Sequence, residues 1–335
     1  MLAPHSPMSR RTMLRHTLGA GAALAVAPLS AANRPGDDAS PSQGPASTAP
    51  DEAPDASPRA EIRTRPIPSS GEPLPCVGLG TWRQFDVGPD AEARSALRDV
   101  LRTLVELGGS VVDASPMYGR AERVVGTLSR ELGLVDEIFG ATKVWTRGRE
   151  DGVEQMTRSM KLMRQRPMDL MQVHNLLDWR THLDTLQTWK ADGRVRYVGV
   201  THYTTAAFDD LAAVLRERPV DFVQLPYSIA TTRAEERLLP LAADRNVGVI
   251  VNRPFEGGSL FGRVEGAALP DWAASFDCES WAQFFLKYLL GHEAVTCVIP
   301  GTSDPEHARD NLRAGYGRLP DADTRERMRA ALADL

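Results

Sequence analysis

The sequence predicts a single (β/α)8 barrel of the TIM type over residues 61–335. Eight short apolar runs each precede a stretch with helical periodicity. The runs are continuously apolar rather than alternating, which is typical of parallel strands covered on both faces. Eight such units over about 250 residues fit a closed barrel. A doubly wound open sheet is the alternative, but no G-x-G-x-x-G stretch joins a strand to a helix.

The eight units follow one another along the chain, with glycines or prolines at most joints. The strands are predicted within 76–80, 110–114, 137–143, 168–174, 195–201, 221–226, 247–254 and 295–301. The helices are predicted at Pro89–Leu107, Ala121–Leu132, Glu150–Arg164, 180–191, Thr205–Arg216, Ala234–Arg245, Ser280–Leu290 and Pro305–Arg313.

Two further elements flank these units. The stretch "IRTRPIPSSGEPLP" before the first barrel strand predicts a hairpin that turns at Ser70 and Gly71 and closes the bottom of the barrel. The C-terminal stretch predicts a loop followed by one amphipathic helix, without a long tail over the barrel mouth.

The first 60 residues are predicted to lie outside the barrel. Residues 1–32 combine the pair Arg10 and Arg11 with a short, mildly apolar, uncharged run, as in a signal peptide. The order Ser-Arg-Arg-x-Met-Leu-Arg resembles the twin-arginine export signal, with Met13 in place of the usual aromatic residue. Residues 33–60 read as a disordered Pro/Ala/Ser/Asp linker. The expected location is periplasmic or extracellular, with the twin-arginine translocation machinery as partner. A cytoplasmic protein with a chance arginine pair is the alternative.

Composition excludes several other classes of function. The formal net charge is −5, and no long basic run follows residue 60, so nucleic acid is not an expected partner. The three cysteines, Cys76, Cys278 and Cys297, show neither metal-ligand spacing nor a disulfide framework and are expected as buried thiols. The apolar run near the N-terminus is shorter than the ~20 residues of a spanning helix, so no stable membrane span is expected.

Four side chains with proton-transfer chemistry fall at predicted strand ends. Asp113 ends the second apolar run, Lys143 the third and His174 the fourth, while Tyr118 lies in the loop after the second. Singly, each has an ordinary structural explanation: a turn former, a solvated lysine, or a packed histidine or tyrosine. In a barrel, however, all four would meet on the C-terminal rim, where barrel enzymes build their active sites.

The motifs around these positions resemble those of the aldo-keto reductase family. They are "GLGTW", "VVDASPMYG", "ATKVW", "QVHN", "VGVT", "VQLPYS" and "IPGTSDPEHARDN", in order from about residue 62 to 320. The resemblance implies a barrel that binds a nicotinamide cofactor and interconverts an aldehyde or ketone and an alcohol by direct hydride transfer. It also implies a catalytic tetrad of Asp113, Tyr118, Lys143 and His174.

The chemistry of that tetrad can be argued from its residue types. A phenol with an ordinary pKa near ~10 remains protonated at neutral pH, so Tyr118 can donate a proton to a developing alkoxide. The ammonium of Lys143 is expected to lower that pKa, and Asp113 to keep Lys143 charged. His174 is expected to donate a hydrogen bond to the carbonyl oxygen.

The resemblance also implies a cofactor site, with NADP(H) favoured over NAD(H). Gly301 and His307 stand where the family often has a lysine and an arginine, which weakens the case for a bound 2′-phosphate. His202 replaces a usual amide, and Asn252 replaces an aromatic residue that stacks on the nicotinamide. The full expected set is Thr81, Thr201, His202, Gln224, Asn252, Arg253, Gly301, Thr302, Ser303, His307, Asp310 and Asn311.

Trp82 and Trp145 follow predicted strands beside the tetrad and are expected to line an apolar substrate pocket for a small carbonyl or alcohol compound. Core packing is their alternative role. A non-catalytic barrel that binds nicotinamide nucleotides or senses redox state is the alternative function. The sequence does not determine the substrate, the direction of the reaction or the oligomeric state.

Overall fold

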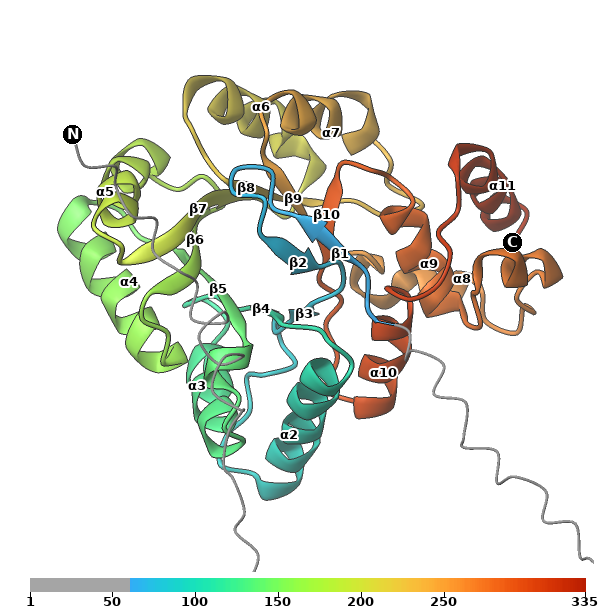
Figure 1. The fold of residues 1–335 in the computed structure, drawn as a ribbon, viewed down its shortest axis with the longest axis horizontal. Helices are drawn as coiled ribbons and strands as arrows, with labels where there is room; N and C mark the ends of the chain where they lie inside the picture. The colour runs from blue at the N-terminus through green and yellow to red at the C-terminus, as the bar shows by residue number, and fades with distance from the viewer. Residues whose placement is uncertain (1–60) are drawn as a thin grey trace, which may run out of the picture. The chain divides into compact units, whose positions relative to one another are not determined.

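Eight parallel strands curve into a nearly closed barrel in the computed structural model, which describes residues 61–335 (Figure 1). Their order in the sheet is their order in the chain, as predicted. The strands are β3 (Leu79–Gly80), β4 (Val111–Asp113), β5 (Phe139–Val144), β6 (Met168–His174), β7 (Val195–Thr201), β8 (Phe222–Pro226), β9 (Gly248–Asn252) and β10 (Val295–Val298). The expected signal peptide and linker, residues 1–60, lie outside the described residues.

The barrel closes where its first strand meets its last. Isolated parallel bridges join Val77 to Val298 and Gly80 to Gly301. A Cβ on Gly80 would lie 2.8 Å from the carbonyl oxygen of Ile299, and one on Gly301 would lie 3.1 Å from the carbonyl oxygen of Gly80. Glycine at both positions therefore lets the two backbones approach closely enough to complete the ring.

Helices connect the strands and form an outer ring (Figure 1). They are α2 (Ala91–Glu106), α3 (Ala121–Glu131), α4 (Arg149–Met163), α5 (Trp179–Ala191), α6 (Phe208–Glu217), α7 (Ala234–Asp244), α8 (Ser259–Arg263), α9 (Trp281–Leu290), α10 (Pro305–Arg313) and α11 (Ala322–Ala333). Short 3-10 turns lie at Val135–Glu137, Thr205–Ala207, Glu256–Gly258 and Asp271–Phe276.

The predicted hairpin is present as β1 (Thr64–Pro66) and β2 (Pro73–Pro75). Its turn includes Gly71 at φ +76°, a conformation that favours glycine. Ile67 and Leu74 from the hairpin join a buried cluster with residues from inside the barrel, including Phe139 and Phe222. The hairpin therefore plugs the end of the barrel opposite the expected active site.

The predicted barrel helices agree with the structure to within three residues at each end. The short helix α8 and the turn Asp271–Phe276, both between β9 and α9, were not predicted because neither has enough residues to show a helical period. All three cysteines are buried and free, as expected. Within residues 61–335, no helix is long and apolar enough to cross a membrane, and no cluster of potential metal ligands occurs there.

Candidate active site

The four predicted catalytic residues lie together at the C-terminal end of neighbouring strands. Asp113 is the last residue of β4, Lys143 lies near the end of β5, and His174 is the last residue of β6. Tyr118 follows β4 in the loop before α3. Parallel register pairs β4 with β5 and β5 with β6, so three adjacent strands present these side chains at one rim.

A buried ion pair joins the first two of these residues. The Nζ atom of Lys143 lies 2.6 Å from Oδ2 of Asp113, and it also donates to the carbonyl oxygen of Ala114 at 2.7 Å. The Lys143 side chain is wholly inaccessible, and Asp113 is 2% exposed. The amide groups of Gln172 and Gln224 donate to Oδ1 of Asp113 at 3.3 and 2.9 Å. Each carboxylate oxygen therefore has a donor, as a buried charge requires.

This pairing keeps the lysine charged despite its burial. Burial alone acts to lower the pKa of Lys143, but the opposing effects of Asp113, Tyr118 and Glu122 together make the net shift upward. The ammonium group therefore remains protonated at neutral pH and places a positive charge beside the tyrosine.

Tyr118 lies next to that charge. The Nζ atom of Lys143 is 5.1 Å from the centroid of the Tyr118 ring. Burial raises the pKa of Tyr118 above its ordinary value, the charge of Lys143 lowers it, and Asp113 raises it. The lowering effect expected from Lys143 is present, but burial outweighs it, so the phenol is held in its protonated form.

His174 completes the group. Its ring meets that of Tyr118 edge to face, with centroids 5.8 Å apart. Burial, assisted by the charge of Lys143, lowers the pKa of His174 to about 2, so the imidazole is neutral. Its Nδ1 atom lies 2.9 Å from the hydroxyl oxygen of Ser115. Ser115 did not stand out in the sequence, where its only signal is its place two residues after Asp113.

Several predicted cofactor residues form a polar network with the tetrad. Gln224 donates to Asp113, while its Oε1 accepts from Thr201 at 3.0 Å and from Asn252 at 3.3 Å. Asn252 also donates to the carbonyl oxygen of His202 at 3.1 Å. The Oδ1 atom of Asn252 is buried and has no hydrogen-bond partner among the described residues. This buried acceptor is thus left without a hydrogen bond within the described part of the chain.

His202 has one ring nitrogen committed to the protein. Its Nδ1 accepts from the backbone N–H of Thr204 at 3.2 Å, which requires the neutral ring to carry its proton on Nε2. The ring also stacks on Tyr203, with centroids 5.4 Å apart. His202 therefore offers a donor where the family pattern has an amide.

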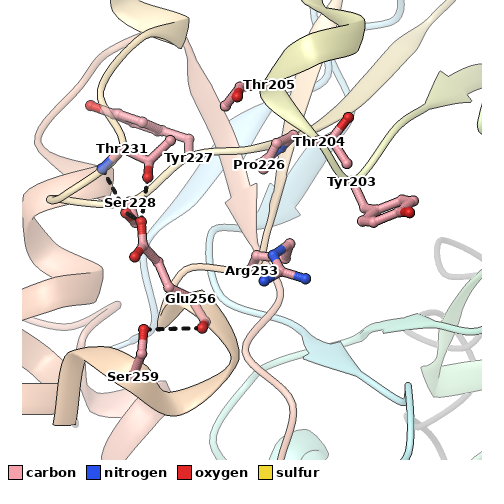
Figure 2. A pocket seen from close by; sticks show the side chains of 10 residues that line it. All are labelled: Tyr203, Thr204, Thr205, Pro226, Tyr227, Ser228, Thr231, Arg253, Glu256 and Ser259. Carbon is pink, nitrogen blue, oxygen red and sulfur yellow. Dashed lines mark hydrogen bonds between the residues drawn. The ribbon is translucent and has the colours of Figure 1, made fainter. Parts of the chain in front are cut away.

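A cavity of about 380 Å³ opens beside this network, over the ends of β7, β8 and β9 (Figure 2). Arg253 makes no ion pair with any residue of the described chain, and it lies apart from Glu256 across the cavity (Figure 2). The carboxylate of Glu256 instead accepts from the hydroxyls of Ser228, at 2.7 Å, and Thr231. The cavity is lined by Tyr203, Thr204, Thr205, Pro226, Tyr227, Ser228, Thr231, Arg253, Glu256 and Ser259.

The remaining predicted cofactor residues lie just before α10 or within it. Asp304 caps this helix by accepting from the backbone N–H groups of Glu306 and His307. Thr302 and Asn311 are buried there, whereas Ser303 and His307 are exposed. The start of a helix can bind a phosphate through its backbone N–H groups, but two of these groups are already paired with a carboxylate here.

Two residues of the predicted cofactor set form hydrogen bonds with other parts of the barrel. Thr81 is wholly buried, and its hydroxyl donates to the carbonyl oxygen of Asp113 at 2.9 Å. Asp310 accepts from Ser280 and Gln283, each at 2.7 Å, and thereby joins α10 to the start of α9. In this structure the two side chains hold the backbone of Asp113 and a helix start.

Large apolar side chains are exposed on the loops that follow three successive strands. Trp82 follows β3 and is 46% exposed, and Trp145 follows β5 and is 41% exposed. Met117, in the loop between β4 and Tyr118, is 39% exposed and was not predicted as a pocket residue. The backbone of Trp145 is held on both sides by Gln155, which accepts from its N–H at 2.6 Å and donates to its carbonyl at 3.2 Å. The backbone that carries the exposed ring is therefore held in place by two hydrogen bonds.

Comparison with known proteins places this site in context. The family model described as "Aldo/keto reductase family" matches residues 76–330. Methylglyoxal reductase YeaE of Escherichia coli is 26% identical over 71% of this chain and 84% of its own length. The NADH-specific methylglyoxal reductase of the same species is 23% identical over 77% and 95%. An aldo-keto reductase from Klebsiella pneumoniae, solved in complex with NADPH, superposes with a TM-score of 0.66 at 22% identity, over 81% of this chain and 95% of that one.

The lowered pKa of His174 predicts a specific loss of stability in acid. The unfolded chain binds a proton on this histidine below about pH 6.5, whereas the folded protein does not until about pH 2. The free energy of unfolding therefore falls as the pH drops through this window. Between pH 6.5 and 5, a His174→Gln variant should lose less stability than the wild type, by up to about 2 kcal/mol in urea titrations. Exposed His307→Gln is the control, and equal losses in the wild type and His174→Gln would contradict the prediction.

Proposed function

Because the chain belongs to the aldo/keto reductase family, we propose that it is an NAD(P)(H)-dependent oxidoreductase that interconverts an aldehyde or ketone and an alcohol. The observation that carries this proposal is the position of Tyr118 beside Lys143, whose ammonium group is itself paired with Asp113. A protonated phenol beside a buried cation is suited to supply a proton as a carbonyl oxygen gains negative charge.

The residues divide the reaction between them. The nicotinamide, when bound, supplies the hydride that reduces the carbonyl carbon. Tyr118 gives its phenolic proton to the oxygen, which leaves an alcohol and a phenolate. Lys143 stabilises that phenolate through its charge, and Asp113 keeps the ammonium group in place. Because the pKa of Tyr118 is not lowered below its ordinary value, the phenol is protonated at neutral pH and carries the proton that reduction requires.

His174 acts on the same oxygen as Tyr118 but does not transfer a proton. A neutral imidazole has one N–H donor and cannot repel the neighbouring ammonium of Lys143. Its hydrogen bond to the carbonyl oxygen stabilises the charge that develops there. The edge-to-face contact between the two rings, with centroids 5.8 Å apart, supports a shared action on one oxygen.

The side chains beyond the tetrad fit a nicotinamide dinucleotide. His202 can donate a hydrogen bond from Nε2 to the oxygen of a carboxamide group. Arg253 offers an unpaired guanidinium to the pyrophosphate, within a cavity that also holds hydroxyls from Thr204, Thr205 and Ser259. Position 252 has no aromatic ring to stack on the nicotinamide, so we expect these polar groups to hold the cofactor instead.

We propose NADP(H) as the preferred cofactor. The bound NADPH of the Klebsiella pneumoniae structure supports it, whereas one Escherichia coli relative is NADH-specific. Because Asp304 already binds two amides at the start of α10, we expect side chains to contribute to holding the 2′-phosphate. The exposed Ser303 and His307 are the side chains placed to do so.

The exposed residues Trp82, Met117 and Trp145 support a substrate with an apolar or aromatic body. Exposed apolar side chains beside a polar catalytic group are typical of small-molecule sites. We therefore assign them to the substrate wall, with the carbonyl group directed at Tyr118 and His174.

Replacing the phenol tests the enzymatic role directly. Tyr118→Phe should lower kcat for reduction of an aromatic aldehyde about 10²- to 10⁴-fold, because the proton donor is lost. The affinity for NADPH, measured by fluorescence titration, should change little. Tyr316→Phe is the matched control, since the Tyr316 hydroxyl bonds the carbonyl oxygen of Leu107 and not the site. A wild type that binds NADPH but is as inert as Tyr118→Phe would favour the non-catalytic alternative.

We also propose that the chain is exported through the twin-arginine pathway with cofactor bound. The support is the Arg10–Arg11 pair ahead of the uncharged run in residues 1–32. Protein recovered from the periplasm should begin near residue 33 and carry nucleotide, and Arg10→Lys with Arg11→Lys should retain it in the cytoplasm. An uncleaved, cytoplasmic wild type would refute export without affecting the proposed reaction.

A further inference from the structure

Ser115 contacts both groups proposed to act on the substrate oxygen, Tyr118 and His174. Its carbonyl oxygen accepts from the backbone N–H of Tyr118 at 3.0 Å, which forms the turn that carries the phenol. Its hydroxyl oxygen accepts from the backbone N–H of Met117 at 3.3 Å and lies 2.9 Å from Nδ1 of His174. The residue is wholly buried, so water does not substitute for these contacts.

The hydrogen bond between Ser115 and His174 has a preferred direction. A hydroxyl carries one proton, and Nδ1 of His174 is the acceptor within reach of the Ser115 hydroxyl in the described chain. If Nδ1 instead donated to Ser115, the hydroxyl proton would be buried without an acceptor, which is costly. Ser115 therefore donates, and Nδ1 of His174 accepts.

This direction determines where the imidazole carries its own proton. A neutral imidazole that accepts at Nδ1 must be protonated at Nε2. The Nε2 atom has no hydrogen-bond partner among residues 61–335, and it is absent from the fully buried unpaired atoms of that region. It is accordingly an accessible N–H donor beside Tyr118.

We propose that Ser115 is a positioning residue that fixes the Nε2–H tautomer of His174 and so presents this N–H to the substrate carbonyl oxygen. The part played in turnover rests on the proposed function, whereas the tautomer does not. Ser115 touches no substrate, and its effect passes entirely through the histidine.

The tautomer can be read directly by nuclear magnetic resonance. Full-length protein with ¹⁵N-labelled histidine should show, for His174, a pyridine-type Nδ1 and a pyrrole-type Nε2. The signals are assigned by their loss in His174→Gln. Ser115→Ala should convert them toward averaged or reversed values, and Ser115→Thr, which keeps the hydroxyl, should restore the wild-type pattern. A pyrrole-type Nδ1 in the wild type would overturn the proposal even if no variant folds.

Kinetics separate this role from a merely structural one. Ser115→Ala should lower kcat about twofold with little change in the KM for NADPH, because the ring loses the hydroxyl group that keeps Nδ1 an acceptor and holds the ring in place. Ser110→Ala is the matched control, since this buried hydroxyl on the same segment has no partner in the described chain. An unchanged His174 spectrum in Ser115→Ala would refute the proposal. A shifted spectrum in a protein that reduces no carbonyl compound would support the tautomer and refute the proposed function.

Discussion

The contact between Lys143 and Asp113 is the interaction on which the rest of the site depends. Both charges are buried, and neither would be tolerated there without the other. Their pairing places an ammonium group beside Tyr118. The same carboxylate also accepts hydrogen bonds from Gln172 and Gln224. The lysine charge also contributes to the neutrality of His174. One ion pair thus contributes, together with burial, to the electrostatic state of the two groups proposed to act on the substrate.

The barrel supplies the rigid frame that this pair requires. Apolar and aromatic side chains fill the end closed by the hairpin, whereas the opposite end carries the polar network. Asp113 is the last residue of β4, and its backbone oxygen is held by Thr81 from the neighbouring strand end. Since parallel strands end at one rim, residues far apart in the chain reach hydrogen-bond distance without any long loop.

The sequence predicted the barrel, the hairpin and the position of the tetrad because these follow from strand periodicity and from residue type at strand ends. It did not predict which polar groups would pair with each other. The contact of Ser115 with His174 and the exposure of Met117 could not be predicted, because a single serine or methionine in a loop forms no recognisable pattern. The direction of the Tyr118 pKa shift was also missed, since it depends on burial, which only the packed structure reveals. Likewise, the sequence did not show that Thr81 bonds the backbone of Asp113 or that Asp310 bonds the start of α9, and their expected cofactor contacts stay predictions.

The most direct test of this account is a double-mutant cycle on the buried ion pair. The free energy of unfolding is measured by urea denaturation at pH 7 for the wild type, Asp113→Asn, Lys143→Met and the double variant. Each single substitution leaves a buried charged group without its partner and should lower the free energy of unfolding by about 3–5 kcal/mol. The double variant should lose well below the sum of the two single losses. Strictly additive losses would show that the two side chains are not coupled, and the proposed basis of the site would be wrong.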